Sequence, residues 1–148
     1  MKGIALTFEH EHGEKGCRTS ADAVNKNRCL SHMGRQSPGR KMDYLFITKQ
    51  TDFFEVGCGE CALVGGVKTT KELVDAGFKM AKIMRDMMFK IVKESPGLLH
   101  KLHMTGFYIA DNMQTLWILY APPLGYISRC YAFLPVQYPT TESKFAVV

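Results

Sequence analysis

The stretch from Gly39 to Glu72 constrains the fold of this 148-residue chain more than any other. It contains two runs of β-forming residues, Tyr44 to Thr48 and Phe53 to Val56, which are joined by a short polar turn. A glycine-rich segment follows and leads into a helix rich in lysine. The stretch therefore predicts two neighbouring strands and, after them, a helix.

Three acidic residues lie at the ends of these two runs. Asp43 opens the first run, and Glu55 and Glu60 flank the glycines that end the second. Mg²⁺ is usually held by one or two carboxylates together with water and a substrate phosphate. Side chains alternate along a strand, so Glu55 and Glu60 share one face only if a one-residue bulge lies at the glycines. The pattern indicates the metal site of a magnesium-dependent phosphodiesterase.

The chain has a formal net charge of +5, and its positive residues are concentrated in one segment. Between Lys15 and Met42 there are seven cationic residues and a single acid, Asp22. The cationic residues are Lys15, Arg18, Lys26, Arg28, Arg35, Arg40 and Lys41. Such a segment favours a polyanionic partner, nucleic acid before membrane, although many basic segments are only solvated surface.

The sequence lacks the patterns that are typical of membrane-spanning and secreted proteins. No apolar run reaches the roughly 18 residues of a membrane-spanning helix, and the first residues do not have the pattern of a signal peptide. The five cysteines form no obvious disulfide framework, which is typical of a reducing compartment. We therefore expect an intracellular protein, cytoplasmic or nuclear, without a membrane partner.

The longest predicted helix begins at a capping box of Thr69 and Glu72 and ends before Pro96. Its apolar residues, many of them methionine, keep helical spacing and predict a core face. Charged residues on the opposite face are spaced three or four apart, which predicts an exposed stripe of ion pairs. They are Lys71, Asp75, Lys79, Lys82 and Asp86.

The remaining elements complete a single compact domain, for which a hydrophobic content of 46% is sufficient. A short helix is expected within residues 19–33, and three strands within 102–110, 115–120 and 126–133. We expect the domain to span residues 19–138, with a flexible segment, 1–18, before it and a loose C-terminal tail, 139–148, after it.

The order helix, strand with Asp43, strand with Glu60, helix, strand resembles the core of the PD-(D/E)XK nuclease superfamily. The likeness covers about residues 19 to 140. Residues 39–43, 55–60, 71–73 and 79–87 are similar, more narrowly, to a group of uncharacterised proteins from fungi of the Mucor and Rhizopus type. The resemblance implies an α/β (α+β) architecture, the restriction-endonuclease-like fold, in which a central mixed sheet is flanked by helices.

The superfamily motifs map onto this chain with one departure. Met42-Asp43 stands where the superfamily has Pro-Asp, and Glu60-Cys61-Ala62 stands where it has acid-x-Lys. Both acids are kept, whereas Ala62 replaces the lysine that positions the attacking water and neutralises charge on the phosphate. Some members take this lysine from the following helix, which nominates Lys68, Lys71 or Lys79 here.

The resemblance therefore implies two overlapping sets of site residues. Asp43, Glu60 and Lys71 are the expected catalytic residues. Asp43, Glu60 and Glu55 are the expected metal ligands, and Mg²⁺ is the expected ion.

Three hypotheses for function follow. In the first, a degenerate PD-(D/E)XK-type domain binds nucleic acid and has lost catalysis together with the lysine. In the second, the domain is an active Mg²⁺-dependent endonuclease that hydrolyses phosphodiesters. In the third, the chain is an interaction domain without a nucleic-acid role, or a gene fragment. Many proteins of this fold pair up, so the resemblance also allows a homodimer.

Overall fold

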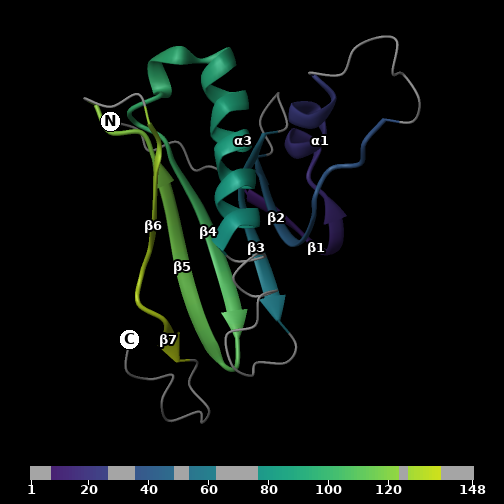
Figure 1. Cartoon of the computed structure of the whole chain (residues 1–148), viewed down its shortest axis with the longest axis vertical. Helices are drawn as coiled ribbons and strands as arrows, with labels where there is room; N and C mark the ends of the chain where they lie inside the picture. The colour runs from purple at the N-terminus through teal and green to yellow at the C-terminus, as the bar shows by residue number, and fades with distance from the viewer. Residues whose placement is uncertain (1–7, 27–35, 49–53, 63–76, 124–126, 138–148) are drawn as a thin grey trace.

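The computed structural model describes residues 8–26, 36–48, 54–62, 77–123 and 127–137 (Figure 1). The elements are β1 (Phe8–Gly16), α1 (Arg18–Asn25), β2 (Lys41–Thr48), β3 (Glu55–Ala62), α3 (Met80–Glu94), the 3-10 helix η3 (Pro96–Leu98), β4 (His103–Ala110), β5 (Met113–Tyr120), β6 (Arg129–Ala132) and β7 (Val136–Gln137).

The strands form one mixed sheet in the order β1-β2-β3-β4-β5-β6, and β7 also pairs with β5. All neighbours are antiparallel except β3 and β4, which are parallel and are connected through α3. Helix α3 crosses β3 and β4 and packs against α1 (Figure 1). The predicted α+β architecture with a central mixed sheet is confirmed.

Methionine side chains fill the space between α3 and the sheet. Met80, Met84 and Met87 are completely buried, so the predicted core face of the helix is confirmed. Gly106 on β4 makes this close packing possible, because a Cβ there would lie 2.7 Å from Cε of Met80. Among the described residues, no helix is long and apolar enough to cross a membrane.

Helix and strand boundaries follow the sequence closely where local signals are strong. Helix α3 ends at Glu94, directly before Ser95-Pro96, and the runs expected at 102–110 and 115–120 are β4 and β5. The third run, 126–133, contains the short strand β6. The expected capping box of Thr69 and Glu72 lies outside the described residues, as does the C-terminal tail.

The expected flexible N-terminal segment is wrong for Phe8–Gly16, which forms β1 and pairs with β2. Strand pairing depends on backbone hydrogen bonds, and these are available to any extended segment beside a sheet edge. The alternating Glu and His residues of this segment gave no apolar pattern from which the strand could be predicted.

The two glycines of β3 lie beneath aromatic rings. Phe107 of β4 packs against Tyr44 and Phe46 of β2, with ring centroids 5.4 Å and 6.0 Å apart. A Cβ at Gly59 would lie 2.3 Å from Cζ of Phe107, and one at Gly57 would lie 2.7 Å from a backbone oxygen of β4. The backbone of β4 and the ring of Phe107 therefore approach these two glycines closely.

Gly59→Ala should destabilise the protein by about 1 to 3 kcal/mol, because the added methyl group displaces the Phe107 ring. Gly97→Ala is the matched control, since nothing lies within 4 Å of a Cβ at that position. Urea denaturation measures both changes. The double variant Gly59→Ala/Phe107→Leu should recover part of the loss, and additive effects of the two substitutions would contradict this account.

Candidate functional site

Asp43 and Glu60 belong to β2 and β3, two adjacent antiparallel strands. Tyr44 pairs with Gly59, and continuing this register by one residue places Asp43 opposite Glu60. Side chains directly opposite in such a pair share one face of the sheet and lie about 5 Å apart at Cβ. Oδ2 of Asp43 accepts a hydrogen bond of 2.8 Å from the backbone N–H of Cys61, which fixes this carboxylate beside β3.

A lysine from the start of α3 completes this group. Nζ of Lys79 lies 2.7 Å from Oε1 of Glu60, and the two side chains are only 18% and 11% exposed. Ala62 lies two residues beyond Glu60 on the same strand, whereas Lys79 comes from the start of the helix. Lys79 is one of the three lysines that the resemblance nominated. Lys71 and Lys68, the other two, lie outside the described residues.

The expected exposed stripe of ion pairs along α3 is wrong for Lys79 and Asp86. Lys82 is exposed as predicted, but Lys79 is largely covered and Asp86 is 7% exposed. Helical spacing shows that these residues lie on one side of α3. It does not show that α1 and the sheet cover part of that side, because this coverage depends on the tertiary arrangement.

Glu55, the expected third metal ligand, contacts the first turn of α1. Its Oε1 accepts from the backbone N–H of Arg18, and its Oε2 accepts from the backbone N–H of Thr19, both at 2.8 Å. The thiol of Cys17 donates to Oε2 at 3.2 Å. These donors belong to the first turn of α1, where a carboxylate also interacts favourably with the helix dipole. Glu55 therefore caps the first turn of α1.

Strand β3 contains a one-residue bulge, which lies directly before Gly57. Phe46 pairs with Gly57, but Ile47 pairs with Glu55, so Val56 is an extra residue in β3. This shift turns Glu55 toward α1, while Glu60 contacts Lys79 at the start of α3. Both carboxylates thus point toward the helices but interact with different ones.

The carboxylates of Asp43 and Glu60 fit a hard cation that takes only some of its ligands from the protein. Among the described residues, no group of three or more His, Cys, Asp and Glu side chains is arranged to hold a metal ion. Two carboxylates, Asp43 and Glu60, are nevertheless what Mg²⁺ uses when water and substrate phosphate supply its other ligands.

The pKa of the Cys61 thiol depends on the charges of Asp43 and Glu60. Burial raises the pKa of its thiol, and the negative charges of Asp43 and Glu60 raise it further. Cys58 is completely buried, and burial raises its pKa to about 12. Both cysteines are free thiols.

No family model matches the chain, and it has no significant similarity to any curated protein or solved structure.

Glu55→Ala should lower the free energy of unfolding by about 2 kcal/mol, because two amide groups of α1 lose their acceptor. Urea denaturation measures the loss, and hydrogen exchange should show faster exchange at Thr19. Asp22→Ala, at a carboxylate of the same helix that is 67% exposed, is the control and should change stability by less than about 0.5 kcal/mol. Equal effects of the two substitutions would contradict the capping role.

Asp43→Asn and Glu60→Gln should each make Cys61 react several times faster with iodoacetamide at pH 8. Removing a nearby negative charge lowers the pKa of the thiol, so more thiolate is present at that pH. Peptide mass spectrometry measures the rate at each cysteine. Cys130 is an internal control, because its raised pKa has burial as its only cause. Unchanged Cys61 rates would mean that the acids do not face this thiol.

Proposed function

We propose that this domain is a metal-dependent phosphodiesterase acting on nucleic acid, with Asp43 and Glu60 as the metal ligands and Lys79 as the stabilising cation. The observation that carries the proposal is the position of Lys79. Its ammonium group contacts Glu60, which lies opposite Asp43 when the β2–β3 register is continued by one residue. Two acids and a lysine are the minimum set that the resemblance requires, and here the lysine comes from the helix.

The sequence of elements supports this assignment. Helix α1, strand β2 with Asp43, strand β3 with Glu60, helix α3 and strand β4 follow one another in the order that the resemblance implies. The parallel pairing of β3 with β4 requires the crossover that α3 provides, and this crossover brings Lys79 back to Glu60.

Each side chain has a role that follows from its chemistry. A divalent cation in such a site supplies Lewis acidity toward a phosphoryl oxygen and a lowered pKa for its bound water. Asp43 and Glu60 provide the hard oxygen donors. Without metal and substrate, Lys79 balances the charge of Glu60. When substrate is bound, its ammonium group is available to neutralise the charge that develops on the phosphate.

The basic surface supports a nucleic-acid substrate. Every described cation of the segment from Lys15 to Lys41 is exposed. These residues are Lys15, Arg18, Lys26, Arg40 and Lys41. Lys41 pairs with Glu14 at 2.8 Å, but an exposed ion pair of this kind is weak and yields to a phosphate. The charge therefore favours a polyanion, with binding that weakens steeply as salt increases.

A domain that binds nucleic acid without cleaving it is the second candidate. The observation in its favour is that both acids already have partners, since Asp43 accepts from Cys61 and Glu60 from Lys79. In this case the Lys79–Glu60 pair is a structural contact between α3 and β3. An interaction domain without any nucleic-acid role is the outcome if no binding is found at low salt.

The wild-type protein should cleave DNA or RNA with Mg²⁺ or Mn²⁺, and Lys79→Met should slow cleavage about 100-fold, because phosphate charge is no longer neutralised. Asp43→Asn and Glu60→Gln should abolish it. Single-turnover assays on labelled single- and double-stranded substrates measure the rates. Lys82→Met, at an exposed lysine on the same helix, is the control and should retain the rate.

The double variant Lys79→Met/Ala62→Lys tests the assignment further, because it returns the lysine to the motif position on β3. We expect partial recovery of cleavage. Salt-sensitive binding with no cleavage by any form would favour the second candidate. Cleavage that survives both acid substitutions would rule out the proposed site.

A further inference from the structure

Large apolar side chains are exposed together at one edge of the sheet. Strands β6 and β7 pair with the same edge of β5, because every residue of β5 pairs with β4 at the other edge (Figure 1). The residues of this edge patch are between 41% and 86% exposed. They are Leu116, Ile127, Tyr131, Phe133, Leu134 and Val136. A monomeric protein rarely exposes a large apolar patch, so this edge is suited to contact with another molecule.

The edge patch approaches the size of a stable interface. The backbone N–H of Phe133 donates to the carbonyl of Leu116 at 2.9 Å, and the ring centroids of Phe133 and Tyr131 lie 5.0 Å apart. At about 150 to 250 Å² for a whole large side chain, the exposed fractions of the six residues correspond to roughly 700 Å². Each partner in a standard protein–protein interface contributes about 800 Å². The patch is therefore large enough to form most of a dimer interface.

Strand β6 also presents backbone groups that can pair with a further strand. It is the last strand in the order of the sheet, and β5 is its only neighbour among the described residues. All of its residues are exposed, on both faces of the sheet. Proteins usually protect such an edge with several charged residues or a covering segment, because its outer N–H and C=O groups are a template for pairing. Arg129 is the only charged residue of β6, so the strand is poorly protected.

We propose that β6 pairs with β6 of a second copy of this chain, antiparallel and around a two-fold axis at Tyr131. Arg129, Tyr131 and Phe133 share one face of the sheet, because they lie opposite alternate residues of β5. The proposed register sets the two Tyr131 side chains beside each other and sets Arg129 opposite Phe133 of the second copy, a favourable cation–ring pair. A register centred on Arg129 would instead bring two like charges together.

The chemistry of this strand favours a second copy over other partners. Residues 129–133 supply both members of each cross-strand pair, as a two-fold interface requires. They contain one cation and no acid, so they do not select a polyanion, and an apolar interface core is typical of homodimers. Asp43 and Glu60 belong to β2 and β3, which lie away from this edge in the order of the sheet. The pairing therefore does not depend on the proposed function.

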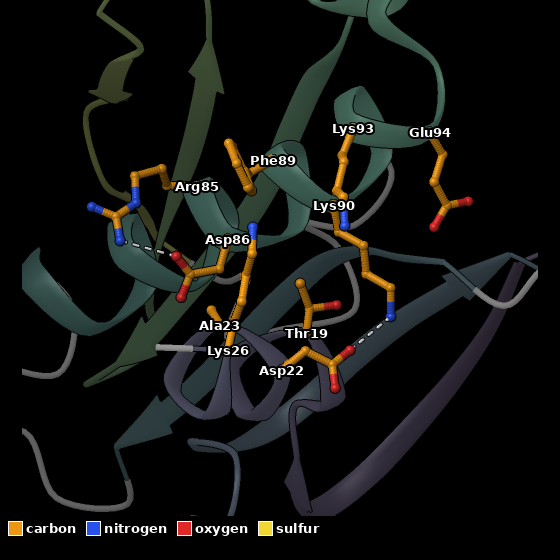
Figure 2. A pocket seen from close by; sticks show the side chains of 10 residues that line it. All are labelled: Thr19, Asp22, Ala23, Lys26, Arg85, Asp86, Phe89, Lys90, Lys93 and Glu94. Carbon is orange, nitrogen blue, oxygen red and sulfur yellow. Dashed lines mark hydrogen bonds and ion pairs between the residues drawn. The ribbon is translucent and has the colours of Figure 1, made fainter. Parts of the chain in front are cut away.

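Sedimentation equilibrium of the full chain at increasing concentration tests the proposal. The wild-type protein should reach the mass of two chains. Tyr131→Glu should raise the dissociation constant of the dimer about 100-fold or more, because two carboxylates would lie opposite each other. Phe89→Glu is the matched control, since Phe89 is 62% exposed and Tyr131 is 57% exposed. Phe89 lines a groove between α1 and α3 (Figure 2), so its substitution should leave the dimer unchanged.

Cysteine cross-linking tests the register of the two strands. Opposite residues of an antiparallel pair lie about 4.5 to 5.5 Å apart at Cα, which is within the range of a disulfide. Tyr131→Cys, made together with Cys130→Ser, should therefore form a covalent dimer on mild oxidation with diamide. Lys93→Cys in the same Cys130→Ser background is the control, because Lys93 is exposed on α3, and it should not cross-link.

Three results would overturn the proposal. They are a monomer at every concentration, a dimer that survives Tyr131→Glu, and a dimer that does not cross-link through Tyr131→Cys. Thermal unfolding of Tyr131→Glu and Phe89→Glu shows whether both variants fold. A monomer that Tyr131→Glu destabilises would also contradict the pairing, because another part of this chain would then cover the edge patch.

Discussion

The ion pair between Lys79 and Glu60 is the interaction on which the rest of the site depends. It joins the start of α3 to the middle strand of the sheet, and both side chains are largely covered. Removing one partner of a covered pair leaves the other charge without compensation, which costs about 3 kcal/mol or more. The start of α3 is therefore fixed relative to β3. The same contact places a cation beside the acids at the β2–β3 pairing.

Strand β3 organises both helices because of one extra residue. Without the bulge at Val56, Glu55 and Glu60 would point to opposite faces of the sheet. With it, Glu55 binds the amides of the first turn of α1 and Glu60 binds Lys79. Gly59 leaves room for the ring of Phe107, and Gly57 leaves room for the backbone of β4 at Thr105. Two acids and two glycines thus position α1, α3 and β4, while the methionines between them adapt to the space that remains.

Local signals in the sequence predicted the core face and the end of α3, which depend on interactions between residues close in sequence. The helical spacing of Met80, Met84 and Met87 gave the core face, and Ser95-Pro96 gave the end of α3. Strand β1 was missed because a backbone-paired edge strand needs no apolar pattern. The capping of α1 by Glu55 could not be predicted, because a contact with a residue 37 positions away leaves no signature in the sequence. Lys79 was found only as one of three alternatives, since helical spacing cannot show which lysine reaches Glu60.

Asp86 is the residue that stability alone does not explain. Its carboxylate is buried on the same helix as Lys79, but only one of its oxygens has a hydrogen-bond partner among the described residues. An apolar side chain of similar size would fill this position without the desolvation penalty. Lys79 shows the opposite case, because its covered charge is compensated by Glu60. Helix α3 thus carries a charge that is compensated within the protein and, two turns later, a carboxylate of which only one oxygen has a hydrogen-bond partner among the described residues.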